Sequence, residues 1–167
     1  MTDIKEVFGT NLQHDAITTA ATWLARGAYA VLALTTLHHV YGAWRYQTPF
    51  RLHVVAVAVV VAALVVVTHR LLLRKRCRFS LIAFAAATLL FPVLGIGVFE
   101  GAYNHVAKNV LYFAGTAERV LLTLFPPPTY ELPNDVFFEL TGMLQVVPAA
   151  MTARGFAVLL RRWRNSG

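Results

Sequence analysis

Hydrophobic residues fall into four long blocks along the chain, separated by short polar breaks. The blocks cover about residues 16–46, 52–73, 79–113 and 136–160, and the second contains VVAVAVVVAALVVV (54–67) without a polar side chain. A helix that spans a bilayer needs roughly 20 mostly apolar residues. An open sheet cannot satisfy its backbone in lipid, and valine runs lack the period-two alternation of a membrane barrel. The pattern predicts an all-α integral membrane protein, a four-helix transmembrane bundle forming one domain over 1–167.

The composition agrees with a membrane protein, and the distribution of charge predicts its orientation. The chain is 57% hydrophobic and only 14% charged, whereas soluble domains are about a quarter charged. Lysine and arginine crowd the break between the second and third blocks (70–78) and the C-terminus (161–164). Under the positive-inside rule both segments are cytoplasmic, so we expect cytoplasmic N- and C-termini in a bacterial plasma (inner) membrane.

The same charge pattern limits the partners. The net charge of +7 is confined to the expected cytoplasmic ends, which favours the lipid bilayer and its anionic headgroups as a partner and argues against nucleic acid. The second block has no polar side that would mark an interior face. We therefore expect a homo-oligomer or membership of a larger membrane complex.

The segment expected outside the membrane, residues 114–135, ends in FPPPTYELPND (125–135). Three consecutive prolines impose a stiff, extended backbone, so this loop is able to fold over the outer face as a lid. Asn134 or Asp135 is a natural N-cap for the fourth block. In the third block Pro92 removes a helix hydrogen bond, and a kink is expected there.

Residues capable of chemistry gather at the expected outer ends of the blocks. They occur in LTTLHHVYGAW (34–44), in EGAYNHVAKNVLY (100–112) and at the start of the fourth block. Histidine and carboxylate side chains that project into a helix bundle from several helices bind metals, and imidazole with carboxylate suits zinc, iron or copper. The hypothesis is a transition-metal site on the outer side, with redox or hydrolytic chemistry left open. Its candidate ligands are His38, His39, Glu100, His105 and Glu139. Candidate residues of the surrounding pocket are Tyr41, Tyr103, Asn104, Lys108 and Tyr112.

Regular helix geometry sets limits on this hypothesis. Successive side chains point about 100° apart, so only one of His38 and His39 is expected to face a given site. Glu100 and His105 are about 140° apart on a regular α-helix, so they share a target only if the helix is irregular. Neither H-E-x-x-H nor E-x-x-H occurs in the chain. As an alternative role, Glu139 stabilises the positive end of its helix.

Two other functions remain open at this point. Two histidines from facing helices bind b-type haem, and His38 or His39 with His105 would supply that pair. Gly42 and Gly101 would then admit the ring. Alternatively, the protein is a non-catalytic accessory subunit or binds a lipid or small molecule in its polar pocket.

Overall fold

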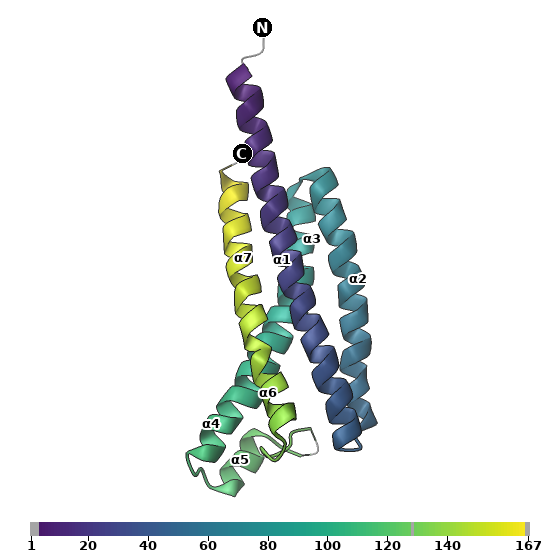
Figure 1. The fold of residues 1–167 in the computed structure, drawn as a ribbon, viewed down its shortest axis with the longest axis vertical. Helices are drawn as coiled ribbons and strands as arrows, with labels where there is room; N and C mark the ends of the chain where they lie inside the picture. Colours follow the sequence, from purple (N-terminus) through teal and green to yellow (C-terminus); the bar gives the residue numbers. More distant parts are fainter. Residues whose placement is uncertain (1–3, 128, 166–167) are drawn as a thin grey trace.

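The computed structural model describes the backbone of residues 4–127 and 129–165, and their side chains from residue 15 onward. Every regular element in these ranges is helical (Figure 1). The elements in chain order are α1 (Ile4–Arg45), η1 (Pro49–Arg51), α2 (Leu52–Lys75), α3 (Arg78–Leu89), η2 (Leu90–Ala107), α4 (Lys108–Phe113), α5 (Glu118–Leu124), α6 (Val136–Leu144) and α7 (Val146–Arg164).

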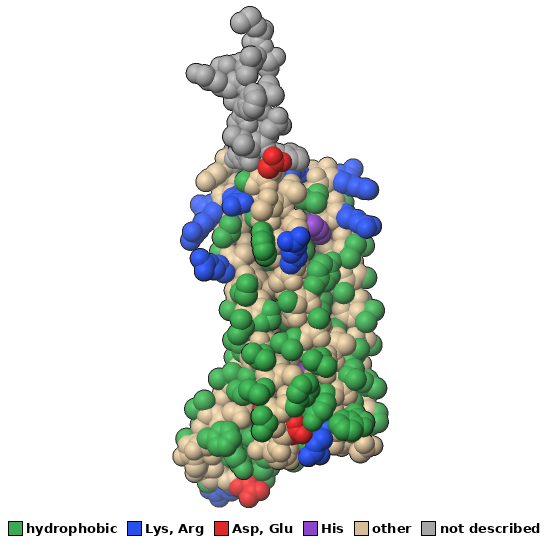
Figure 2. Space-filling view, viewed as in Figure 1, with side chains coloured by type: hydrophobic (Ala, Val, Ile, Leu, Met, Phe, Trp, Pro, Cys, Tyr) green, Lys and Arg blue, Asp and Glu red, His purple; other side chains and the backbone are tan. Residues whose placement is uncertain are grey.

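Four helical stretches are long and apolar enough to cross a membrane. They run from Asp15 to Arg45, Pro49 to Lys75, Arg78 to Phe113 and Val136 to Arg164. The prediction of an all-helical fold with four such helices is confirmed. Figure 2 shows an apolar middle of the molecule with charged side chains at its two ends.

The first span is the centre of the bundle and the second is peripheral. α1 contacts α2, α6, α7 and η2, and small side chains such as Ala21 and Ala28 are fully buried along it. Small residues let helix backbones approach closely in the absence of a hydrophobic driving force. By contrast α2 leaves Val59, Val60 and Val67 exposed, a surface suited to lipid or to another apolar partner.

The third span changes its geometry midway. After α3, the segment η2 is a π-helix, in which backbone hydrogen bonds join residues five apart. Pro92 lies near its start and cannot donate a backbone hydrogen bond, so the regular ladder is interrupted there. At Pro92, where the sequence predicts a kink, the structure has a widened helix. Its consequence is that residues five apart lie near one another on the helix surface.

The connection from the third to the fourth span packs against the end of the bundle. Leu121 of α5 and the following Phe125 are buried, and the Phe125 ring lies 5.1 Å from the ring of Tyr103. The Asp135 carboxylate accepts a hydrogen bond of 2.9 Å from the backbone N–H of Phe138. This confirms Asp135 as the N-cap of α6, which begins the fourth span.

Candidate metal centre

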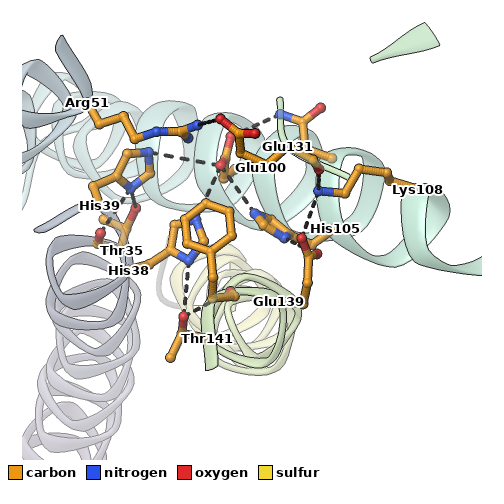
Figure 3. A network of polar contacts seen from close by, with 12 residues as sticks. Thr35, His38, His39, Arg51, Glu100, His105, Lys108, Glu131, Glu139 and Thr141 are labelled. Carbon is orange, nitrogen blue, oxygen red and sulfur yellow. Dashed lines mark hydrogen bonds and ion pairs between the residues drawn. The ribbon is translucent and has the colours of Figure 1, made fainter. Parts of the chain in front are cut away.

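Three helices bring the predicted ligands into one cluster near the end of the bundle that carries α6. His38 and His39 come from α1, Glu100 and His105 from η2, and Glu139 from α6 (Figure 3). The exposed fractions are 0% for His38, 5% for His39, 2% for His105 and 4% for Glu139. Ionisable side chains buried within apolar spans are costly and mark functional sites.

The three imidazoles converge on one atom, Oε1 of Glu100 (Figure 3). The Nε2 atoms of His105, His38 and His39 lie 3.5, 3.6 and 3.9 Å from it. These separations exceed the range of a hydrogen bond, about 2.7–3.2 Å. They resemble the edges of a tetrahedral metal site, which are about 3.4 Å for bonds of 2.0–2.1 Å. Ligand atoms of His38, Glu100 and His105 all lie within 4.8 Å of one another, close enough to bind one metal ion.

The π-helix explains how Glu100 and His105 share a target. On a regular α-helix they would point about 140° apart. Within η2 the hydrogen-bonding interval is five residues, which is also the spacing between these two side chains. The side chains therefore converge without a break in the helix.

Each imidazole uses its second nitrogen to contact a nearby acceptor. His105 Nδ1 lies 2.8 Å from a Glu139 carboxylate oxygen, and His39 Nδ1 lies 3.0 Å from the Thr35 carbonyl oxygen. His38 Nδ1 lies 3.1 Å from the Thr141 hydroxyl. A carboxylate and a carbonyl only accept, so the Nδ1 atoms of His105 and His39 carry the proton.

The Thr141 hydroxyl is compatible with the same tautomer for His38. It lies 2.8 and 3.0 Å from the backbone carbonyls of Phe137 and Phe138, which only accept hydrogen bonds. When the hydroxyl donates to either carbonyl, it accepts from Nδ1 of His38, and this is the tautomer that we assign. These assignments follow from the partners of each ring. In the neutral form, all three rings then present an Nε2 lone pair toward Glu100, and binding partners of this kind orient metal-ligating histidines.

The positive charges around the centre are already paired with other acids. Lys108 Nζ lies 2.9 Å from Oε1 of Glu139, and Arg51 Nη2 lies 3.5 Å from Glu131. Within the described residues, Glu100 has no lysine or arginine partner.

The remaining contacts leave the facing nitrogen of His38 unsatisfied. Oε2 of Glu100 accepts a hydrogen bond of 2.9 Å from Asn104, while Oε1 faces the Nε2 atoms of the three imidazoles. His38 Nε2 is buried and has no hydrogen-bond partner in the part of the chain that the structure describes. With neutral rings protonated at Nδ1, the largely buried Glu100 carboxylate faces acceptors, and in that state the geometry favours a cation between them.

Glu139 lies behind His105 and not among the converging atoms. Its Oε2 accepts from Asn109 Nδ2 at 2.6 Å as well as from His105, and its Oε1 accepts from Lys108. Both carboxylate oxygens are therefore occupied by protein donors. The geometry suits Glu139 to orient His105, in the manner of a carboxylate–histidine–metal arrangement.

The other predicted pocket residues divide into two groups. Asn104 and Lys108 belong to the network. The three tyrosines lie outside it: the Tyr41 hydroxyl donates to Asp135 at 3.0 Å, the Tyr103 hydroxyl donates to the Leu124 carbonyl at 3.1 Å, and Tyr112 packs edge to face on Phe113. Aromatic rings at span ends are typical of the membrane interface, which explains their position.

Four residues that support the cluster were not identified from the sequence. These residues are Thr35, Arg51, Glu131 and Thr141. A spacing of four residues, which places side chains on one helix face, links Thr35 to His39 and was available as a signal. The same spacing places Asn109 on the face of His105, and Asn109 donates to Glu139 in the structure. Nothing local in the sequence indicates the contacts of Arg51, Glu131 and Thr141.

The loop after α5 is attached to the centre through Glu131. The Glu131 carbonyl accepts a hydrogen bond of 2.6 Å from Lys108, and its carboxylate pairs with the buried Arg51. Nearby, burial and the acidic groups of Asp135, Glu139 and Glu131 raise the pKa of Tyr46 to about 12. That hydroxyl stays protonated and donates to the Asn134 side chain at 2.8 Å. The loop is therefore held at the rim of the centre by polar contacts to α4, to η1 and to the residue that follows α1.

Protein-family models, curated proteins and solved structures all fail to match this chain. Its function is therefore inferred from the chemistry of the side chains themselves.

Proposed function

We propose that this protein is an integral membrane protein that binds a divalent transition metal through His38, Glu100 and His105. The observation that carries the proposal is the convergence of three imidazole Nε2 atoms on one carboxylate oxygen, at 3.5–3.9 Å. Every imidazole has an acceptor at Nδ1, and the carboxylate has no lysine or arginine partner among the described residues. A divalent cation satisfies all of these groups at once.

The donor set favours zinc or iron. Two histidines and one glutamate form the ligand set of many catalytic zinc sites, and two histidines with one carboxylate also bind non-haem iron(II). The cluster contains no thiolate or thioether, which makes copper(I) the weaker candidate. Three protein ligands leave a coordination position for water or substrate, so the proposed centre is suited to hydrolysis with zinc or to oxygen chemistry with iron.

His39 is proposed as an alternative fourth ligand. Its Nε2 is the farthest of the three from Glu100, at 3.9 Å, and its Nδ1 is held by the Thr35 carbonyl. A small movement toward the ion would close the site with four protein ligands, a geometry typical of structural zinc. Whether His39 binds therefore distinguishes a catalytic from a structural centre.

Haem is less compatible with the same side chains. The His38 and His105 rings are in edge contact, with centroids 4.6 Å apart, which leaves no room for a macrocycle between them. Gly42 and Gly101 do not open space for a ring either. A Cβ atom at Gly42 would collide with the Phe138 ring, and one at Gly101 would lie 3.0 Å from Val146.

The orientation in the membrane is part of the proposal. Positive side chains gather at the end formed by the α2–α3 connection and the C-terminal part of α7, opposite the metal centre. The positive-inside rule then places both termini in the cytoplasm and the centre toward the outside of a bacterial inner membrane. Cys77 is exposed at the basic end. An impermeant thiol reagent is expected to label it in inverted vesicles and not in intact cells, and the reverse would overturn this orientation.

Association with further copies or with other membrane proteins is proposed on the exposed surface of α2. Its valines Val59, Val60 and Val67 offer a uniform apolar face without a polar contact to prevent packing. Crosslinking in membranes between cysteines introduced singly at these positions is expected to give dimers if this face joins two copies.

Metal content of the purified protein tests the main proposal. Elemental analysis after purification in detergent, and after reloading with Zn²⁺ or Fe²⁺, is expected to give one ion per chain. His38→Ala and His105→Ala should each lower the stoichiometry to near zero. His53→Ala is the matched control, because His53 is an exposed histidine at the start of α2.

The outcomes separate the alternatives. A stoichiometry well below one after reloading, or equal retention in all three variants, would sink the metal proposal and favour a non-catalytic accessory or lipid-binding protein. An absorption band of haem in the purified protein would favour haem instead. A hydroxamate or other chelating inhibitor that binds the loaded protein would show that a coordination position is open.

A further inference from the structure

A groove lies between α1 and α7 at the basic end of the bundle, away from the metal centre. Its volume is about 420 Å³. The lining residues are Thr19, Ala20, Trp23, Met151, Arg154, Gly155, Val158 and Arg162. The groove therefore combines two arginines and a hydroxyl with an apolar surface.

The polar part of the groove is suited to an anion. Arg154 makes no hydrogen bond or ion pair with any residue that the structure describes. Arg162 donates one hydrogen bond to the Ala16 carbonyl, and a guanidinium has further N–H groups to offer. Among the described acids only Asp15 lies at this end, whereas Arg74, Lys75 and several other cations do. The local charge is strongly positive.

The apolar part of the groove is suited to a hydrocarbon chain. Trp23 and Met151 are 60% and 65% exposed, and Val158 continues the same surface. Gly155 lines the same groove. A Cβ atom there would be in ordinary van der Waals contact with Leu24, at 3.7 Å, so a side chain longer than that of alanine has to turn away from Leu24.

We propose that this groove binds an anionic phospholipid, independently of the metal centre. Arg154 and Arg162 bind the headgroup phosphate, for which guanidinium groups have matching geometry. The acyl chain lies along Trp23, Met151 and Val158. Basic pockets between transmembrane helices are known sites for anionic headgroups. The groove differs from the general attraction of a basic surface because it is a cavity with an apolar wall.

Quenching of Trp23 by brominated lipid tests the proposal. The chain has three tryptophans, so the Trp44→Phe, Trp163→Phe protein reports on Trp23 alone. This protein would be reconstituted in phosphatidylcholine vesicles that contain a minor share of brominated phosphatidylglycerol. A parallel sample would contain brominated phosphatidylcholine instead. Phosphatidylglycerol is expected to quench at about tenfold lower mole fraction, since each basic residue near a membrane surface contributes measurably to anionic lipid binding. Equal quenching by the two lipids would overturn the proposal.

Two kinds of variant, made in the Trp44→Phe, Trp163→Phe protein, distinguish lipid binding in the groove from general attraction to a basic surface. Arg154→Gln with Arg162→Gln should abolish the preference for phosphatidylglycerol, whereas the matched pair Arg74→Gln with Lys75→Gln should keep it. Gly155→Leu fills the groove without changing the charge and should lower quenching by the anionic lipid. If the control pair loses as much preference as the groove pair, or if Gly155→Leu has no effect, the site is not this groove. Circular dichroism and gel filtration in detergent check that each variant is folded.

A soluble competitor distinguishes lipid from a free anion. Glycerol phosphate has the phosphate of the headgroup but no acyl chain. It is expected not to displace brominated phosphatidylglycerol from Trp23 at equal concentration, because the apolar wall contributes nothing to its binding. Full displacement would show that the groove binds a soluble anion, and the lipid assignment would be wrong.

Discussion

The two ends of the bundle carry ionisable side chains in opposite circumstances. Around the candidate metal centre, Lys108 and Arg51 are buried, and each is paired with an acidic partner from another part of the chain. At the basic end, cations such as Arg74 and Arg154 are exposed. A buried charge depends on its partner, whereas an exposed one is screened by water and salt. Identical substitutions at the two ends should therefore have very different effects.

Removal of a buried cation is expected to have the largest effect. Lys108→Met deletes the partner of Glu139 and leaves a buried carboxylate without its closest positive charge. Breaking a buried ion pair from one side costs about 3–5 kcal/mol. The free energy of unfolding in detergent, measured by chemical denaturation of the metal-free protein, should fall by that amount.

Two further variants sharpen the result for Lys108. Arg74→Met removes an exposed cation and is expected to change stability by less than about 0.5 kcal/mol. Lys108→Met combined with Glu139→Gln removes both charges and should recover part of the loss. If the single and double variants are equally unstable, the loss reflects packing and not the buried charge pair.

Disturbing the close packing between Gly142 and His105 should have the next largest effect on stability. A Cβ atom added at Gly142 would collide with the His105 ring, so Gly142→Ala must displace the ring or α6. Overpacking of this kind costs about 1–3 kcal/mol. Metal affinity, measured by competition with a chromophoric chelator, should fall although no ligand is altered. Gly155 is the control at the other end, because a Cβ atom there meets only ordinary van der Waals contacts. Gly155→Ala should leave both the stability and the metal affinity unchanged.

Loss of the hydrogen bond to His38 should have a smaller effect, which lowers metal affinity and leaves stability unchanged. Thr141→Val keeps the shape of the side chain and removes the hydroxyl that accepts from His38 Nδ1. Partners of metal-bound histidines contribute about 10–100-fold in affinity. Thr123→Val is the control, because the Thr123 hydroxyl is bonded only to its own helix at Arg119. Unchanged affinity in Thr141→Val would argue that His38 is not a ligand.

The helices and the candidate ligands were predictable from the sequence, whereas the geometry that brings the ligands together was not. The long apolar blocks predicted the helices, because lipid leaves the backbone no other solution. Candidate ligands were predicted because polar residues within such blocks are rare. The convergence of Glu100 and His105 was not predictable from regular geometry, since it depends on the π-helix of η2. Pro92 marks where the regular hydrogen-bonding ladder is interrupted, but it does not indicate that the interval becomes five residues along the whole of η2.

Contacts between distant segments account for the rest of what was missed. Thr141 reaches His38 across 103 positions of sequence, and Glu131 reaches Arg51 across 80. Threonine and arginine are common at helix ends, so their types alone do not distinguish such a role. Asp135 was found because an N-cap is a local feature, defined by the first turn of its own helix.

That local feature gives the smallest predicted effect and a dependence on pH. Asp135→Ala removes the cap of α6 and should cost about 1 kcal/mol.

The Phe138 backbone N–H, together with Tyr41 and Arg45, holds the pKa of Asp135 below its ordinary value. A carboxylate with a lowered folded-state pKa stabilises the fold above its unfolded value, about 3.9, and this stabilisation disappears as pH falls through the folded value. In thermal melts with chelator present, the advantage of wild type over Asp135→Ala should therefore be constant near neutral pH and vanish in acid. Asp135→Asn caps the helix without titrating, so its advantage over Asp135→Ala should persist at low pH. A pH-independent difference between wild type and Asp135→Ala would mean that the carboxylate acts by shape and not by charge.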